Sequence, residues 1–330
     1  FGFNGSGVTA NYNTNAAAGN PASSTTMAGT PGSNPTDLTL SAIGTNGFTV
    51  AWTKGTTGTN TLIVVRAGGN PADPSDLNSY TANPIFGSGS NLGSSSYVVY
   101  NGTGSSVTVT NLAPGTSYTV EASSFNGSGG SENYRSTPTS ATGSTLMPEP
   151  TTQASDIAFG SLAATSYAVS YAAGNGLSRL VVAKQGSAVD WTPTDGTAYS
   201  GENNAFGSGT ELSAGNFLVH RGASPFTLSG LTAANDYHIR IFEYQGTNAT
   251  LNYNVSAATG NPSNRYALST EPTAHGTLSA TAASDTEIDL DWGDATGESG
   301  FVIVRQTADS GWTAPADGTA YSVGNALGGG

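Results

Sequence analysis

The stretch Asn111-Leu-Ala-Pro-Gly-Thr-Ser-Tyr118 lies between two β-rich runs, residues 107–110 before it and residues 118–122 after it. Pro114 fixes its own φ and Gly115 can take a positive φ, so a tight corner between two strands is predicted here. Tyr118 begins the second strand, where its ring can pack inward and its hydroxyl can reach the backbone across the corner. A tyrosine in this place is typical of two-sheet β-sandwiches. We therefore expect a sandwich built around this corner.

The rest of the chain has the same strand-and-turn composition. Val, Ile, Thr, Tyr and Phe recur in short alternating runs that Gly, Asn and Pro interrupt, and no segment has a convincing helical period. The 45 glycines fit a chain of short strands separated by turns. The sequence therefore predicts an all-β protein.

Charge is scarce and mostly negative. Charged residues make up 9% of the 330 residues, and the net charge is −13. Such a chain has no basic surface for nucleic acid or for an anionic membrane. The absence of cysteine excludes disulfides and thiolate metal sites, and no apolar run approaches the ~20 residues of a transmembrane helix. We expect no nucleic-acid binding, no membrane insertion and no cofactor.

Internal repetition divides the chain. Three similar segments open with NPT from Asn34, EPT from Glu149 and EPT from Glu271. We expect residues 34–148 and 149–270 to form two complete repeats. In the first repeat the predicted strands are residues 36–43, 48–52, 62–66, 97–100, 107–110, 118–125 and 133–142.

The second repeat has the same sequence pattern as the first. FGSGTELSAGNFLVHRG from Phe206 aligns without gaps on FGSGSNLGSSSYVVYNG from Phe86. Residues 167–171 and 180–184 match the second and third strands. Leu231 and Tyr237 match Leu112 and Tyr118, although the turn between them has lost Pro-Gly, which makes this corner the least regular part of the alignment.

Residues 271–330 are expected to form the N-terminal part of a further repeat. Its second strand contains Ile288, Leu290 and Trp292, and residues 301–305 are predicted as its third strand. The large aromatic residues expected in the cores of the successive repeats are Trp52, Tyr171 and Trp292.

The N-terminus resembles the end of a repeat. FNGSGVTANY from Phe3 overlays FNGSGGSENY from Phe125 with equal length, so residues 1–33 are expected to be the end of a preceding repeat plus a linker. We expect a polypeptide that continues beyond both ends. The alternative is head-to-tail strand exchange between copies, in which the N-terminal strand of one copy docks on the unfinished sandwich of the next.

Each repeat carries an insertion of about 30 residues after its third strand. The insertion has a signature of its own: PSDLNSY from Pro74, PTDGTAY from Pro193 and PADGTAY from Pro315. Proline fixes a turn entry, Asp favours an Asx-turn and Gly supplies a positive φ, so we expect a structured flap that its tyrosine closes against the body.

The corner, the strand spacing and the repetition together resemble fibronectin type III domains. Together with the insertion, they resemble a fibronectin type III-like repeat that is common in secreted and cell-surface proteins of the Bacteroidetes group. The resemblance covers nearly the whole chain. It implies tandem immunoglobulin-like β-sandwiches, here with an enlarged insertion after the third strand, and an extracellular or cell-surface location. Because such sandwiches serve many functions, it implies no particular activity.

Two groups of residues are the candidates for binding. Glu287, Asp289 and Asp291 alternate on one strand face, where Ca²⁺ would relieve their repulsion, but a solvated outer face is the more common arrangement and no metal site is expected. Trp191 and Trp312 in the insertions could stack on a glycan. Their matched positions fit the alternative that they anchor the flap.

The sequence favours a non-enzymatic extracellular repeat array: a stalk, an adhesin shaft or a filament component. Three scattered histidines give no catalytic triad, while repetition and a Ser, Thr and Asn cover suit a stable exposed scaffold. The alternative is a carbohydrate-binding accessory region of a larger secreted enzyme. The expected partners are further repeats or other copies of this chain, and glycans or other surface proteins.

Overall fold

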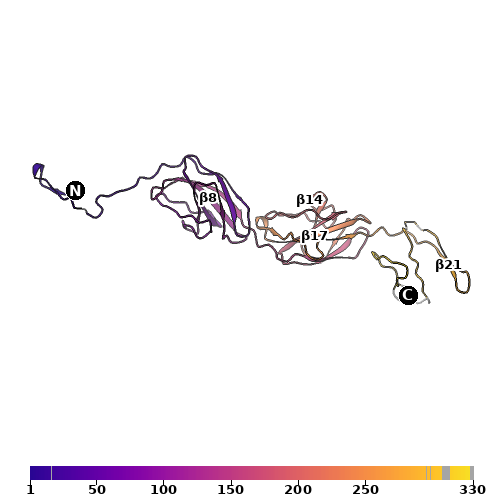
Figure 1. Cartoon of the computed structure of the whole chain (residues 1–330). Coiled ribbons are helices and arrows are strands. Elements are labelled where there is room, and N and C mark those ends of the chain that lie inside the picture. The colour runs from indigo at the N-terminus through magenta and orange to yellow at the C-terminus, as the bar shows by residue number, and fades with distance from the viewer. Residues whose placement is uncertain (16, 295, 298, 307–312, 328–330) are drawn as a thin grey trace. The chain divides into compact units, whose positions relative to one another are not determined.

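The computed structural model describes residues 1–15, 17–294, 296–297, 299–306 and 313–327 (Figure 1). In this part of the chain the only helices are two 3₁₀ turns, η1 (Gly7–Thr9) and η2 (Asn248–Thr250). The chain divides into two compact units, Phe1–Thr145 and Leu146–Gly330, each of which contains one complete sandwich. The all-β prediction is confirmed.

The first sandwich packs a three-stranded sheet against a five-stranded one. All strand pairs are antiparallel; the small sheet has the order β3-β4-β7, and the large sheet has the order β10-β8-β5-β6 with β9 added to β8. The strands are β3 (Thr36–Ser41), β4 (Phe48–Thr53), β5 (Asn60–Ala67), β6 (Tyr97–Gly102), β7 (Ser106–Val109), β8 (Ser117–Asn126), β9 (Asn133–Tyr134) and β10 (Thr139–Ser144).

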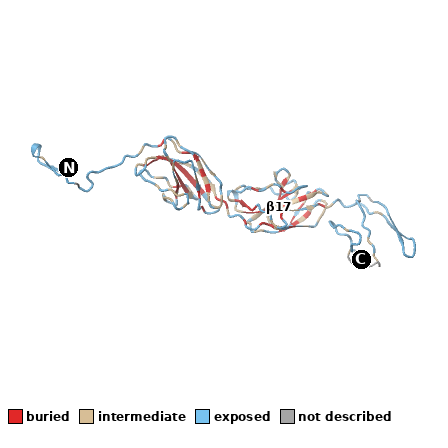
Figure 2. Cartoon of the chain, viewed as in Figure 1, coloured by how far each residue is buried: buried red, intermediate tan, exposed pale blue. Residues whose placement is uncertain are grey.

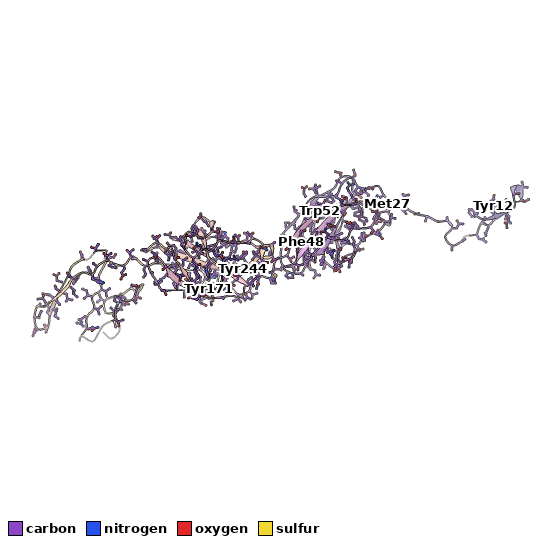
Figure 3. All side chains as sticks on the ribbon, turned by 180° about the vertical axis from the view of Figure 1, so that it is seen from behind. Tyr12, Met27, Phe48, Trp52, Tyr171 and Tyr244 are labelled. Carbon is purple, nitrogen blue, oxygen red and sulfur yellow. The ribbon has the colours of Figure 1, made fainter. Side chains whose placement is uncertain are left out.

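Alternation along β4 creates the core of the first sandwich. Phe48, Val50 and Trp52 are buried on one face, as predicted, and pack with Tyr118 from β8. Figure 3 places Phe48 and Trp52 within this densely packed body. Burial is concentrated in the two sandwiches, whereas the N-terminal segment and the region after the second sandwich are mostly exposed (Figure 2).

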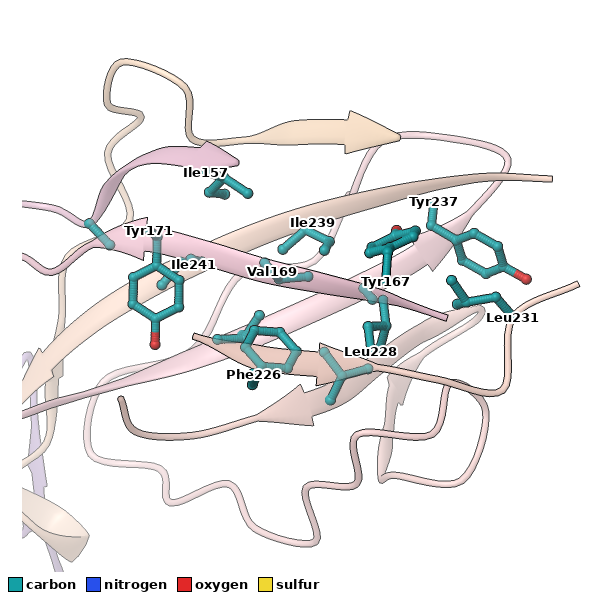
Figure 4. Close-up of a cluster of buried hydrophobic side chains, with 14 of the residues drawn as sticks. Ile157, Tyr167, Val169, Tyr171, Phe226, Leu228, Leu231, Tyr237, Ile239 and Ile241 are labelled. Atoms are coloured by element: carbon teal, nitrogen blue, oxygen red, sulfur yellow. The ribbon is translucent and has the colours of Figure 1, made fainter. Parts of the chain in front are cut away.

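The second sandwich repeats this strand order. Its small sheet is β11-β12-β16, and its large sheet is β14-β15-β13-β17-β18, with β19 also paired to β17. The core lies between the sheets, where β12 side chains such as Val169 face Ile239 and Ile241 of β17 (Figure 4). The strands are β11 (Ser155–Gly160), β12 (Tyr167–Ala172), β13 (Ser178–Gln185), β14 (Glu211–Ser213), β15 (Asn216–His220), β16 (Phe226–Leu228), β17 (Asp236–Gln245), β18 (Asn252–Tyr253) and β19 (Ser263–Tyr266).

Both sandwiches have the predicted tyrosine corner. The hydroxyl oxygen of Tyr118 accepts a hydrogen bond from the Ala113 N–H at 2.8 Å, and that of Tyr237 accepts one from the Thr232 N–H at 2.8 Å. The second corner keeps its geometry without Pro-Gly because Ala234 takes a left-handed conformation (φ 58°), like Gly115 (φ 61°).

One predicted strand is two strands in the structure. Residues 133–142 divide into β9 and β10, and Thr137 between them has φ 58°. The carbonyl groups of Ser136 and Thr137 accept hydrogen bonds from the side-chain amide of Asn34, at 3.0 and 2.7 Å. Pro138 has no N–H to give to a ladder. The backbone therefore leaves the sheet here and re-enters it at β10.

Two predictions for residues 271–330 are wrong. Residues 301–305 form no strand, and Trp292, expected in a core, is 46% exposed. Trp292 lies on β21 (Ile288–Trp292), which pairs with β20 (Leu278–Ala282) in a two-stranded sheet. Within the described residues no second sheet covers this hairpin, so neither of its faces is buried.

The N-terminal hairpin has the same strand register as the matched segments of the two sandwiches. β1 (Phe3–Asn4) pairs with β2 (Asn11–Tyr12) so that Phe3 faces Tyr12. Phe125 faces Tyr134, and Tyr244 faces Tyr253, in the same way in the two sandwiches. We call these segments, residues 3–12, 125–134 and 244–253, the closing hairpins.

Glycine opens each closing hairpin for the same steric reason. A Cβ on Gly5, Gly127 or Gly246 would lie 2.3–2.4 Å from the carbonyl oxygen four residues later, and all three have φ between 89° and 95°. The shared Asn-Gly-Ser-Gly or Gln-Gly-Thr pattern thus has one structural cause.

Candidate functional site: the insert and its closing hairpin

The central strand of each large sheet is buried on both faces. In β5, Ile63 and Val65 face the sandwich core, whereas Leu62 and Val64 belong to a second cluster on the outer face. In β13, Leu180 and Val182 likewise lie in outer clusters. The outer cover is the insertion, residues 68–96 in the first sandwich and 186–210 in the second, which we call the insert.

The aspartate of the insert signature holds the closing hairpin. In the first sandwich, Asp76 Oδ1 accepts the Tyr134 N–H at 2.8 Å, and the Tyr134 hydroxyl donates to the Asn78 carbonyl at 2.9 Å. The Leu77 N–H also donates to the Glu132 carbonyl at 2.8 Å.

The second sandwich repeats this set of bonds at equivalent positions. Asp195 Oδ1 accepts the Tyr253 N–H at 2.8 Å, the Tyr253 hydroxyl donates to the Thr197 carbonyl at 2.9 Å, and the Gly196 N–H donates to the Leu251 carbonyl at 2.8 Å. We call these three bonds the tie. The predicted structured flap is therefore a third layer, fixed to its sheet by the tie.

The tyrosine that ends the signature closes the insert on itself. Its hydroxyl accepts the backbone N–H five residues earlier, the same spacing as in the corner. The bonds are Ser75 to Tyr80 at 3.0 Å, Thr194 to Tyr199 at 3.1 Å and Ala316 to Tyr321 at 2.9 Å. The insert of residues 271–330 therefore has the same local closure.

Burial under the insert keeps the hairpin tyrosines protonated. Tyr134 is 7% and Tyr253 3% exposed, and desolvation raises the pKa of both hydroxyls well above the usual range. Each hydroxyl thus stays a hydrogen-bond donor at any physiological pH.

Trp191 contributes to the cover of the second sandwich. Its ring packs edge-on against Tyr199 at 5.0 Å and against Phe242 at 6.0 Å between centroids. Trp191 is partly buried against both outer clusters, which is the anchoring position that its matched placement suggested. Trp312 lies outside the described residues.

An open pocket of about 300 Å³ lies beside the tie of the second sandwich. Tyr199 from the insert, Arg221 and the hairpin tyrosines Tyr244 and Tyr253 line it, together with Leu177. The Arg221 Nη2 donates to the Tyr244 hydroxyl at 2.7 Å, and the guanidinium lies 5.9 Å from the centre of the Tyr244 ring. The hydrogen bond to Tyr244 raises the pKa of Arg221, so the guanidinium remains charged.

Two donors of Arg221 are not fully used. Its Nη1 lies 3.9 Å from Glu202 Oε2, longer than a hydrogen bond, and its Nε is buried without a partner among the described residues. The Arg221 side chain is 31% exposed and that of Glu202 40% exposed, so both are open to solvent beside the pocket.

The first sandwich has different side chains at the positions that match Arg221 and Tyr244. Phe125 replaces Tyr244, and Asn101 replaces Arg221; Asn101 Nδ2 donates to the Tyr80 carbonyl at 2.9 Å. The sequence interpretation missed Arg221. The gapless alignment sets it opposite Asn101, and this change from an amide to a guanidinium was the available signal.

The three acidic residues considered for a metal site lie on or next to an exposed strand. Asp289 and Asp291 face Thr281 and Ser279 across the β20–β21 ladder, and they are exposed like Glu287 beside them. Across the described residues, no three His, Cys, Asp or Glu side chains gather so as to hold a metal ion.

In the described part of the chain, no helix has the length and apolar character needed to cross a membrane.

Residues 33–142 match the fibronectin type III domain family. The second sandwich shares the strand order and the tyrosine corner of that region, so both sandwiches are fibronectin type III-like. No curated protein matches the chain.

Among solved structures, the chain is similar to a segment of two fibronectin type III domains from chicken tenascin, at 16% identity and a TM-score of 0.29, covering 67% of this chain and 98% of that one. It is also similar to the FN1–FN3 domains of chicken CNTN1, at 15% identity and a TM-score of 0.23, covering 80% and 76%. The central fibronectin-III array of RIM-binding protein matches at 11% identity and a TM-score of 0.22, covering 80% and 79%.

Proposed function

We propose that the chain is a non-enzymatic structural or adhesive repeat array of the cell surface or extracellular space. The observation that carries the proposal is the duplicated tie, because the same three layers and the same three bonds occur in both sandwiches. Repetition of a complete structural unit suits a shaft assembled from modules. The bacterial surface origin implied by the family resemblance is part of this proposal.

Further repeats or other copies of the chain are the partners that fit best. The closing hairpin at residues 3–12 and the self-closed insert at residues 315–321 are counterparts of the two segments that a tie joins in the complete sandwiches. Tyr12 is 58% exposed, whereas its counterparts Tyr134 and Tyr253 are buried under inserts. We infer that neighbouring repeats bring such segments together in the assembled array.

Surface labelling of intact cells of the source organism tests the location. Antibodies against the purified chain should label unpermeabilised cells, and brief external protease treatment should remove the label. Labelling that requires permeabilisation would contradict the proposal. Reproducible hydrolase activity of the purified chain would contradict its non-enzymatic part.

A carbohydrate-binding accessory role is the second candidate. The pocket at Arg221 favours it, since small-molecule sites are commonly lined by aromatic side chains together with a few polar or charged groups. A glycan array separates the two candidates. Saturable binding that Arg221→Gln abolishes, with the sandwich still folded, would favour the accessory role. A chain that binds no glycan would favour a purely structural array.

A further inference from the structure

The pocket of the second sandwich is lined by both hydrogen-bonding and apolar side chains, next to an insert that the tie holds in place. The Arg221 Nη1 is a free N–H donor in the lining, and the Glu202 carboxylate, 3.9 Å from it, is an acceptor next to the pocket. Tyr199 and Leu177, which is 64% exposed, also line the pocket and provide apolar surface. We propose that this pocket binds one neutral saccharide residue.

The arrangement matches the surface of a pyranose. Adjacent sugar hydroxyls both donate and accept, so a guanidinium paired with a carboxylate can satisfy two of them at once. The C–H face of the sugar is apolar and packs against an aromatic ring or an aliphatic side chain. The pocket volume, about 300 Å³, is at the lower end of the range for small-molecule sites.

A neutral ligand fits the charge distribution better than an anion. Glu202 already lies near Arg221, and the neighbouring cations are engaged: Arg179 with Glu243 at 2.9 Å and Lys184 with Asp190 at 2.7 Å. The net charge of −13 also repels an anionic glycan at long range.

The pocket needs little rearrangement to bind. The tie fixes the insert, and Tyr244 holds Arg221 in place at 2.7 Å, so few groups lose freedom on binding. Two of the aromatic lining residues, Tyr244 and Tyr253, are only 5% and 3% exposed, so they offer a ligand little surface. The contact area is therefore small, and we expect dissociation constants in the millimolar range.

The test is titration of the isotope-labelled full chain, followed by NMR. The ligands are the methyl glycosides of glucose, galactose, mannose, xylose and N-acetylglucosamine, with glucuronic acid as the anionic comparison, each up to about 50 mM. At least one neutral glycoside should cause saturable shifts at the Arg221 Nε–H and the Gly246–Thr247 amides. Arg221→Gln should weaken that binding at least about tenfold, and Glu202→Gln about threefold or more.

Arg240→Gln is the matched control, because Arg240 belongs to the same large sheet but is held over the Phe242 ring at 4.7 Å and donates to the Val255 carbonyl. It should leave the affinity unchanged. Should Arg221→Gln fail to fold, the exposed Glu202→Gln carries the test. The proposal is overturned if no neutral glycoside saturates, if both variants bind like the wild type, or if glucuronic acid binds more tightly than every neutral sugar. Such a result would leave the structural array proposed above intact.

Discussion

The two corners differ at one residue, and this difference gives a test at the residue scale. Ala234 has φ 58° where the first corner has Gly115 at φ 61°. The left-handed conformation costs a residue with a Cβ about 1–2 kcal/mol. Glycine avoids this strain, but its unfolded state has more conformational entropy, which offsets part of the stabilisation. Ala234→Gly should therefore stabilise the second sandwich by about 0.5–1 kcal/mol, and Gly115→Ala should destabilise the first by about 1 kcal/mol. Urea denaturation of both variants measures this; a destabilised Ala234→Gly would contradict the corner geometry.

Two buried glutamates of the first sandwich predict pH effects of opposite sign. Burial, together with the nearby carboxylate of Asp73, raises the pKa of Glu121. The folded state therefore loses stability when this group ionises above the ordinary glutamate pKa. Glu121→Gln should make the chain more stable than the wild type at pH 7, and the difference should shrink as the pH falls through the raised pKa.

Glu132 is predicted to have the opposite effect on the pH dependence of stability from that of Glu121. Its carboxylate accepts hydrogen bonds from the Ser79 hydroxyl and from the Gly130 N–H, and the first of these bonds is the main reason that its pKa is lowered. Glu132→Gln should lose stability at pH 7, and the deficit should fade as the pH falls through the lowered pKa. Thermal unfolding of both variants between about pH 3 and about pH 8, a range that extends to about one unit below the ordinary glutamate pKa, checks the two signs. Parallel curves for the two variants would contradict at least one of the two assignments.

At the scale of the element, the tie predicts how the insert depends on one aspartate. Asp195→Ala leaves the buried Tyr253 N–H without its partner, which should cost about 1–3 kcal/mol. Tyr253→Phe removes one hydrogen bond, to the Thr197 carbonyl, and should cost about 1 kcal/mol. Denaturation of the second sandwich measures both changes. Asp76→Ala is the control, because it breaks the tie of the first sandwich alone.

The sequence predicted most of the strands but only part of the insert. The signature around Asp76 and Asp195 predicts a structured flap, yet turn chemistry alone does not say which residue their carboxylates hold. That partner, the N–H of Tyr134 or Tyr253, lies 58 residues further along the chain. The continuous apolar run in β5 and β13 was the signal that both sheet faces are covered.

Other differences also come from tertiary contacts. The break at Thr137 depends on Asn34, more than 100 residues earlier, which no local pattern reveals. The cations that end β5 and β13 have nearby partners: Arg66 donates to the Asn70 carbonyl at 2.8 Å, and Lys184 binds Asp190. Partners this close along the chain are within reach of sequence reasoning, whereas distant ones are not.

At the scale of the whole molecule, the core tryptophan of the first sandwich offers a test of repeat integrity. Trp52 is 5% exposed and packs against Tyr100 with ring centroids 5.0 Å apart. Trp52→Ala should destabilise the first sandwich by about 3–5 kcal/mol, the cost of deleting a large core aromatic residue. Calorimetry of the full chain measures it. Trp292→Ala is the control, because Trp292 is 46% exposed and should change stability by much less.

The central claim is that the insert is a fixed third layer of each repeat. Hydrogen exchange of the native full chain, read by mass spectrometry or NMR, tests it most directly. The amides of Leu77 and Gly196 in the inserts, and of Tyr134 and Tyr253 in the closing hairpins, donate to the tie. They should exchange about as slowly as the amides of the central strands β5 and β13. Exchange of these four amides at the rate of an unstructured loop, while the strands stay protected, would contradict the claim.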